Sequence, residues 1–450
     1  MTDIKPDRKL LFHLFMNGND GFMPHMDEGQ RTSNYIDLPN EEFSHPILAQ
    51  DQMRRYVDNL ALGELLGFDS SVIMEQRVPA ILPSSTVLSS WVLARTKGLR
   101  VGALGPSSTT YASPIKMAEE IAMLDVMSGG RFFVAYPMGI GPAFYQTGAN
   151  PTTARRRHHE FTRLVSRALN EPGPFEHRGE FFNLPYVNLW PKPLHKIETW
   201  MPASGSRESQ VEAARARHTY ITFLSGTKGV VRYLEQFRRI AEDEFGYTPP
   251  PSQLGGTVQV YVAESDKQAR KEFEAGLLWF YQCVLRANFE ESFPPGATTW
   301  QSIQGLLQSG FVFKPEDLTY DAMVNEGMAI VGSPETVTRK LEDFREETGV
   351  GQVLVVADGG GSPEWMVRKS TELFAREVMP HFRPEGGRPI WDDEGRQSGF
   401  NTLSEAGARW PGVPRDMIAK IDGKLYNAHN YHVDDLRVPV DGKPPAFPKQ

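Results

Sequence analysis

The stretch Pro114–Tyr136, PIKMAEEIAMLDVMSGGRFFVAY, contains a complete helix-to-strand unit. Met117, Ile121 and Leu124 recur at the spacing that places apolar side chains on one face of a helix. The following Ser-Gly-Gly predicts the end of that helix, because glycine readily adopts the left-handed conformation of a C-terminal cap. Arg131–Tyr136, RFFVAY, has the length and composition of a buried strand. The stretch therefore predicts an amphipathic helix that leads into a core strand.

The same alternation of apolar runs and helical patterns extends over most of the chain. Runs typical of buried strands occupy residues 10–16, 68–74, 99–104, 131–136, 198–203, 219–224, 257–263 and 351–357. Eight strand–helix units are typical of a parallel (β/α)8 TIM barrel, and a doubly wound open sheet is the competing topology. We predict an α/β barrel over residues 1–382, with insertions at about 18–45 and 288–326. We expect the C-terminal extension, 383–450, to pack on the barrel or on a partner subunit.

Composition bounds the class of protein. The 450 residues are 40% hydrophobic and carry a net charge of -8, with a pI of about 5.8. This charge argues against a nucleic-acid partner or an acidic membrane surface, both of which attract basic faces. The single cysteine, Cys283, excludes an internal disulfide framework. The charged start has no signal-peptide pattern, and no apolar run is long enough to span a bilayer, so we expect a cytoplasmic protein.

In a barrel, ligands bind at the carboxyl ends of the strands. That rule selects Met16 and Asn17, Glu75–Arg77, Leu104–Ser108, Tyr136–Gly139, Ser204–Ser209, Ser225, Glu264 and Asp358–Gly361. The most informative segment is Ala203–Ser209, ASGSRES, which joins a strand to a helix. Free backbone N–H groups at a helix start, with hydroxyls beside them, bind phosphate. A plain helix-capping turn explains the same residues equally well.

Three other features can be interpreted as either structural or catalytic. His13 is either a proton shuttle or a hydrogen-bonded core histidine, and the second is the commoner case. Glu75 is either a buried acid or base, or the partner of a cation such as Arg77. His158 and His159 adjoin three arginines, which favours a solvated helix face. No grouping of His, Asp and Glu has convincing metal-site spacing, so we predict no metal.

Several blocks together resemble the bacterial luciferase-like flavin-dependent monooxygenases. They are LGFDSSVIMEQRV, TKGLRVGAL, PIKMAEEIAMLDVMSGGRFFVAY, GANPTTARRRHHEF and GSPETVTRKLEDF, which lie between about residues 56 and 380. The resemblance implies an eight-stranded barrel, a homodimer, and a flavin at the strand ends. The flavin of this family is usually reduced FMN supplied by a separate flavin reductase. Some relatives instead use a deazaflavin coenzyme for hydride transfer.

The resemblance also assigns roles to individual positions. Ser204, Gly205, Ser206 and Ser209 match the family's phosphate-binding turn. The bond between Leu104 and Gly105 lies where relatives carry a cis peptide under the flavin ring, and glycine would ease its crowding.

Two positions depart from the luciferase pattern. Luciferase has a histidine pair after the strand-two glutamate, but here Gln76 and Arg77 follow Glu75. A luciferase arginine that helps to hold the phosphate falls at Met138, so Arg77 or Arg207 would have to replace it. Light emission of the luciferase type is therefore not expected.

The main hypothesis is a two-component monooxygenase that uses reduced FMN and O2 through a flavin C4a-hydroperoxide. The cofactor carries out the difficult chemistry, and the protein holds the ring and excludes water. Glu75, Gln76, Arg77 and His13 would tune protonation, and Tyr136 and Met138 would line the pocket. Phe-rich segments such as 311–313 suggest a small apolar or aromatic substrate, unless those rings are simple packing. The alternatives are a deazaflavin-dependent hydride-transfer enzyme and a non-catalytic flavin-binding subunit.

Overall fold

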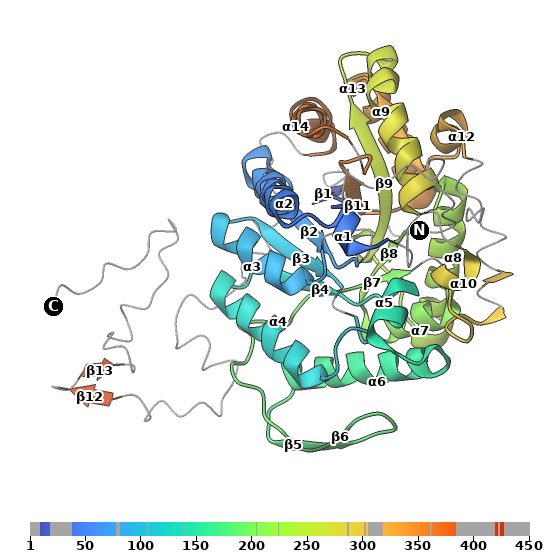
Figure 1. The fold of residues 1–450 in the computed structure, drawn as a ribbon. Helices are drawn as coiled ribbons and strands as arrows, with labels where there is room; N and C mark the ends of the chain where they lie inside the picture. Colours follow the sequence, from blue (N-terminus) through green and yellow to red (C-terminus); the bar gives the residue numbers. More distant parts are fainter. Residues whose placement is uncertain are drawn as a thin grey trace.

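Figure 1 shows the fold in a computed structural model. The structure describes residues 10–18, 38–77, 82–105, 107–139, 141–203, 205–223, 225–285, 288–300, 303–304, 318–360, 362–383, 419–421 and 424–426.

Eight parallel strands form a closed ring. In sequence order they are β1 (Leu11–Phe15), β2 (Ser70–Met74), β3 (Arg100–Leu104), β4 (Phe132–Ala135), β7 (Thr199–Ala203), β8 (Thr219–Thr222), β9 (Leu254–Val262) and β11 (Gln352–Val356). Each strand pairs in parallel with the next, β11 pairs with β1, and β9 pairs with both β8 and β11. The β8–β9 and β11–β1 pairings leave no open edge in this ring. The predicted TIM barrel is therefore confirmed, and the doubly wound open sheet is excluded.

Helices surround the strands (Figure 1). The principal ones are α2 (Pro46–Leu66), α3 (Ser85–Arg95), α4 (Pro114–Ser128), α6 (Pro151–Asn170), α7 (Arg207–Ala216), α8 (Thr227–Phe245), α9 (Asp266–Trp279), α13 (Pro334–Thr348) and α14 (Glu364–Leu373). Local signals set their ends. The Ser113 side chain accepts a hydrogen bond from the backbone of Lys116 at the start of α4, and Gly129 adopts the left-handed conformation at its end. Ser333 caps the start of α13 with its side chain in the same way.

Alternate residues of each strand face two different cores, because strand side chains point to opposite sides in turn. In β1, Phe12 and Leu14 join the large cluster between the barrel and the helices. Phe15 joins a smaller cluster inside the barrel, together with Val72, Leu104, Phe133, Ala135, Trp200, Ile221, Leu354 and Val356. The barrel interior is thus filled with side chains, and a ligand has room only beyond the strand ends.

One strand was not predicted from the sequence. β10 (Ala329–Gly332) pairs with the last four residues of β9, whereas the first part of β9 lies in the ring. β9 also begins earlier than predicted, because the sequence pattern breaks at Gly255 and Gly256. Glycine is required there for close packing: a Cβ on Gly255 would lie 2.1 Å from Cδ1 of Ile221.

The remaining described elements lie outside the ring. A hairpin between the fourth and fifth barrel strands is formed by β5 (Phe175–Arg178) and β6 (Asn183–Val187). A short helix, α5 (Gly141–Thr147), was not predicted. Much of both predicted insertions lies outside the described residues, as does the extension apart from β12 (Ala419–Ile421) and β13 (Lys424–Tyr426). The boundary at residue 382 and the packing of the extension stay predictions. Within the described chain, no helix combines the length and the hydropathy that crossing a membrane requires.

Candidate active site

Glu75 is a buried carboxylate at the end of β2. The Thr110 hydroxyl donates a hydrogen bond of 2.8 Å to Oε1 of Glu75, and the side chain of Glu75 is 5% exposed. Its carboxylate also accepts a backbone hydrogen bond from Ser85, the first residue of α3. Burial raises the pKa of Glu75 above its usual value, although Thr110, Arg77 and the Ser85 backbone oppose the rise. A carboxylate in this environment holds a proton more readily than an exposed carboxylate does.

Arg77 and Gln76 continue the chain from Glu75. A terminal nitrogen of Arg77 lies 4.0 Å from Oε1 of Glu75, and Nε of Arg77 is buried without a hydrogen-bond partner in the described part of the chain. The backbone N–H of Gln76 donates to the carbonyl of Leu82 at 2.9 Å. The structure thus brings Glu75, Gln76 and Arg77 together at one strand end, as predicted from their sequence positions.

Gly105 lies directly against Glu75. A Cβ on Gly105 would lie 2.4 Å from Cβ of Glu75, so only glycine fits at this position. The predicted cis bond between Leu104 and Gly105 is wrong: in the described chain, cis bonds precede Pro174 and Pro191. Gly105 instead has a φ of +97°, which glycine adopts at little cost, and its N–H donates to the Ala135 carbonyl at 3.1 Å.

The predicted phosphate turn lies at the end of β7 and the start of α7. Gly205 has a φ of +83°, and a Cβ there would lie 2.1 Å from the Tyr233 ring. Ser206 is the N-cap residue of α7, but its side chain makes no capping hydrogen bond to the helix backbone. Ser206 therefore satisfies none of the backbone donors in this turn, but the Glu208 carboxylate accepts a hydrogen bond from its own backbone N–H. Ser209 lies in that turn, and Ser204 lies outside the described residues.

Arg155, which sequence reasoning missed, lies beside this turn. A terminal nitrogen of Arg155, on α6, donates to the Ser206 hydroxyl at 3.1 Å. Arg207, one of the two predicted phosphate cations, instead pairs with Glu244 at 2.6 Å and is 61% exposed. Arg77, the other, lies beside Glu75. The charged stretch 154–161 was a signal for a cation here, but only the packing of α6 shows which arginine reaches the turn.

The interpretation of His158 and His159 as part of a solvated helix face needs correction. His158 is 4% exposed, and its ring lies 3.2 Å from the Ser108 hydroxyl. Burial lowers the pKa of His158 to about 3, so the ring is neutral at physiological pH. Arg157 donates to the carbonyls of Ser108 and Tyr111. This part of α6 therefore anchors the loop after β3.

His13 lies at the opposite end of the barrel from the residues above. Its Nδ1 is 2.7 Å from the Ser70 hydroxyl and its Nε2 is 2.9 Å from Oε1 of Gln352. Ser70 and Gln352 are the first residues of their strands, so His13 lies toward the amino-terminal ends. Burial lowers the pKa of His13 to about 3. These contacts are those of a hydrogen-bonded core histidine, and His13 is not brought together with Glu75.

The remaining predicted residues occupy different layers. Leu104 packs inside the barrel near the strand ends. Tyr136 packs between the strands and the helices, and its buried hydroxyl has no hydrogen-bond partner among the described residues. Met138 packs with Phe144, Ala154 and Ala297 beside the start of α6. Neither Tyr136 nor Met138 belongs to the cluster inside the barrel, so the predicted pocket-lining role of both stays a prediction.

Asp358 is a second strand-end carboxylate, selected by position but given no role in the sequence analysis. Its carboxylate accepts hydrogen bonds from the backbone N–H of Asn17 at 2.9 Å and from the Asn17 side chain at 3.1 Å. Burial raises the pKa of Asp358 to about 6, although these donors oppose the rise. Asp358 therefore ties the end of β11 to the end of β1, where the first insertion begins.

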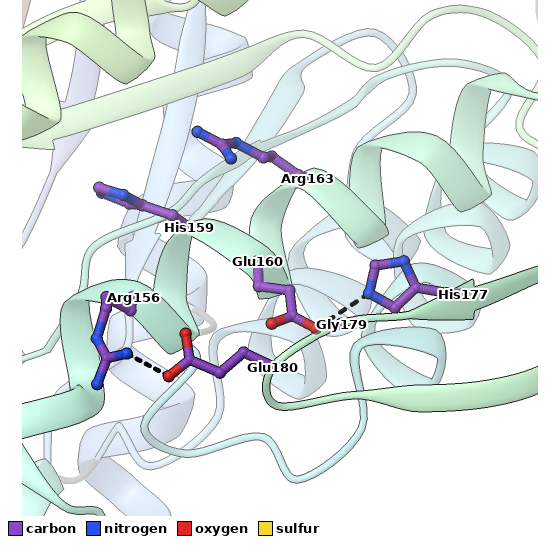
Figure 2. A pocket seen from close by; sticks show the side chains of 7 residues that line it. All are labelled: Arg156, His159, Glu160, Arg163, His177, Gly179 and Glu180. Carbon is purple, nitrogen blue, oxygen red and sulfur yellow. Dashed lines mark hydrogen bonds and ion pairs between the residues drawn. The ribbon is translucent and has the colours of Figure 1, made fainter.

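A hollow of about 400 Å³ lies apart from this site, between α6 and the β5–β6 hairpin (Figure 2). It is lined by Arg156, His159, Glu160, Arg163, His177, Gly179 and Glu180. Its charges are largely paired: Arg156 contacts Glu180, and Glu160 lies 3.0 Å from His177. Glu160 also accepts hydrogen bonds from the backbone of the hairpin, so the cluster holds the hairpin on α6. No group of three metal-ligating side chains occurs within the described ranges.

Many unrelated activities occur on TIM barrels, so the class of this one comes from comparison with known proteins. A family model described as luciferase-like monooxygenase matches residues 36–352. The chain belongs to this family. Limonene 1,2-monooxygenase of Rhodococcus erythropolis is 24% identical over 311 residues, which cover 68% of this chain and 75% of that protein.

Two solved structures show the breadth of this fold. One is the oxygenating constituent of 3,6-diketocamphane monooxygenase from Pseudomonas putida in complex with FMN. It has 19% identity and a TM-score of 0.62, and covers 83% of this chain and 98% of its own. The other is an F420-dependent secondary alcohol dehydrogenase with 14% identity and a TM-score of 0.58, covering 83% of this chain and 99% of its own. Proteins of this fold thus use FMN or the deazaflavin F420.

Proposed function

We propose that this chain is the oxygenase component of a two-component monooxygenase that uses reduced FMN and O2. The observation that carries the proposal is that the start of α7, with Arg155 beside it, lies at the same end of the barrel as a buried carboxylate of raised pKa. The groups that could meet a flavin phosphate are the remaining backbone donors of the first turn of α7, the Ser206 hydroxyl and the Arg155 guanidinium, which donates to Ser206. Reduced FMN, when bound, supplies the electrons with which O2 is activated.

The protein's own part is to hold the flavin, exclude water and manage a proton. The start of α7 would hold the phosphate, and the ring would lie at the strand ends, where Glu75 packs against Gly105. Glu75 replaces the missing imidazole as the proton-holding group, because burial raises its pKa and Thr110 fixes the position of its carboxylate. Arg77 beside Glu75 favours the ionised form and so limits how far that pKa rises.

We also propose a small apolar or aromatic organic substrate and a separate flavin reductase. The reductase proposal is supported by the FMN-bound relative, which is itself the oxygenating constituent of a larger system. Substrate would enter beside the first predicted insertion, which begins just after β1. Residues 301–302 and 305–317 of the second insertion lie outside the described residues.

A homodimer completes the proposal. Neighbouring helices α3 and α4 expose large apolar side chains at helical spacing, namely Val87 and Trp91 on α3 and Met123 and Met127 on α4. Exposed apolar groups gathered on two packed helices are typical of a subunit interface. Sedimentation equilibrium tests this: we expect a dimer, and a monomer for Met127→Glu. A monomeric wild type would contradict it.

The first experiment is anaerobic titration with reduced FMN, followed by rapid mixing with oxygenated buffer. We expect saturable binding and reoxidation slower than that of free reduced FMN, because the site shields the ring from water. A parallel titration uses reduced F420. Binding of F420 without FMN would replace the proposal by the hydride-transfer alternative. Saturable FMN binding, without any change in the reaction with oxygen, would favour a non-catalytic flavin-binding subunit.

A further inference from the structure

The arginines near α7 differ in what they contact. On α6, Arg156 pairs with Glu180 and Arg163 with Glu212. On α7, Arg207 pairs with Glu244. Arg155 has no carboxylate within ion-pair distance in the part of the chain that the structure describes, and it donates a hydrogen bond to the Ser206 hydroxyl. The charge of Arg155 is therefore not taken up by a direct ion pair, unlike the charges of Arg156, Arg163 and Arg207.

The surroundings confirm that positive charge reaches this turn. Glu208, in the first turn of α7, is the nearby internal anion. Its pKa is lowered, although burial acts to raise it, by hydrogen bonds from its own backbone and from Ser206 and by the charges of Arg155 and His159. Ser206 links the two charged groups, since it accepts from Arg155 and donates to Glu208 at 2.9 Å. Arg155 thus offsets a carboxylate that would otherwise repel an anion from this helix start.

The packing of Met138 explains why the cation comes from α6. Met138 stands where luciferase has its phosphate arginine, and here it packs in an apolar cluster with Ala154. Ala154 immediately precedes Arg155 in α6. The same turn of helix therefore buries an apolar side chain against Met138 and carries an arginine to Ser206.

We propose that Arg155 is the residue by which this protein selects a phosphorylated flavin over its unphosphorylated form. The inference rests on the proposed function, since it assumes a flavin at this site. A guanidinium binds a phosphate with two parallel hydrogen bonds, and such charge-assisted contacts are stronger than neutral ones. Arg155 would add these contacts to the backbone donors of α7, and riboflavin, which has no phosphate, would gain nothing from them.

The test compares Arg155→Gln with Arg207→Gln, the adjacent arginine that pairs with Glu244 and points its charge away from the turn. Anaerobic titrations with reduced FMN and reduced riboflavin, followed by quenching of tryptophan fluorescence, give Kd for both ligands. For Arg155→Gln we expect the Kd of FMN to rise about tenfold to 100-fold, as for loss of a charged hydrogen bond. The Kd of riboflavin should stay unchanged. Arg207→Gln should change neither.

A third variant and a folding control complete the experiment. Arg155→Lys keeps the positive charge but cannot make bidentate hydrogen bonds to a phosphate. Its Kd for FMN should therefore lie between those of wild type and Arg155→Gln. Thermal unfolding of each variant without flavin identifies any loss of folding. An equal loss of FMN and riboflavin affinity in Arg155→Gln, or no loss of either, would overturn the role of Arg155 while leaving the proposed function intact. Failure of the wild type to bind either flavin would overturn both.

Discussion

Buried polar groups at the two ends of the barrel differ in whether they have hydrogen-bond partners. At the amino-terminal end, His13, Ser70 and Gln352 satisfy one another, and Glu198 accepts hydrogen bonds of 2.6 Å from both Arg100 and Trp200. At the carboxyl-terminal end, Nε of Arg77 and the hydroxyl of Tyr136 are buried without partners among the described residues.

The titration of the carboxylates differs in the same way. The pKa of Glu198 is lowered: burial acts to raise it, but Arg100 and Trp200 outweigh burial. The pKa values of Glu75 and Asp358 are raised, because their partners do not offset burial. Complete networks stabilise a fold, whereas strained and incompletely paired groups mark functional sites. The proposed function accordingly places the chemistry at the carboxyl-terminal end, and we expect the amino-terminal network to serve stability.

The largest expected effect is loss of the Arg100–Glu198 pair. Arg100→Met leaves a carboxylate of which only a quarter of the side chain is exposed, and should lower the free energy of unfolding by about 3 kcal/mol. Urea unfolding measures this. Arg95→Met, which breaks the exposed pair with Asp58, is the control and should cost less than about 1 kcal/mol. A weaker affinity of folded Arg100→Met for FMN would contradict the division between the two ends.

Glu75→Gln tests the opposite end. We expect the proton-coupled reaction of bound reduced FMN with oxygen to change by about 100-fold, in the range for loss of a general acid or base. The pH dependence of that reaction should vanish. Stopped-flow flavin absorbance measures both. Glu120→Gln is the matched control, because Glu120 also lies near α3 but is bound to Tyr111 and partly exposed. Identical behaviour of the two variants would remove Glu75 from the mechanism.

His13 should make the fold sensitive to acid. Its pKa of about 3 in the folded protein lies below the ordinary value of 6.5, so the unfolded chain binds the proton more tightly. Stability is therefore lost as pH falls below 6.5, by about 2 kcal/mol at pH 5. His13→Gln should lose about 2 kcal/mol less than wild type between pH 8 and pH 5 in urea unfolding. His381→Gln, at an exposed histidine, should follow the wild type.

Asp358 should change the pH dependence of stability in the opposite direction to His13. Its pKa of about 6 lies above the ordinary 3.8, so its contribution is fully present below pH 3.8 and is lost as pH rises through 6. Asp358→Asn should therefore gain about 1.4 kcal/mol relative to wild type between pH 5 and pH 8. A difference that does not change with pH would show that Asp358 is ionised in both states.

The smallest expected change in the free energy of unfolding is that of a substitution at Tyr136. Its hydroxyl is buried without a partner among the described residues, so Tyr136→Phe should leave the unfolding free energy unchanged or raise it by up to about 1 kcal/mol. Tyr220→Phe is the matched case, because the Tyr220 hydroxyl accepts from Gly205 and Gln210, and it should cost about 1 kcal/mol. Thermal and urea unfolding without flavin measure both. A comparable loss in Tyr136→Phe would reveal a partner for its hydroxyl.

Local sequence signals predicted the barrel well and the site in part. The positions of Glu75 and Gly205 followed from strand ends, because the strand-to-helix alternation fixes which residues reach that face. β10 was missed because it is four residues long and pairs with the part of β9 that extends beyond the ring. The solvated face expected around His158 was also wrong, since the burial of a helix face depends on what packs against it.

The sequence by itself determined the eight strand–helix units, their order and the family, because apolar spacing, caps and glycine stops are local properties. Only the tertiary structure decided which charges meet. In the folded protein His13 is separated from Glu75, because it lies near the first residues of β2 and β11. The tertiary structure also places Arg155 rather than Arg207 at the start of α7, because α6 packs beside that turn while Glu244 neutralises Arg207. Pairings between distant segments depend on packing, and sequence spacing does not encode them.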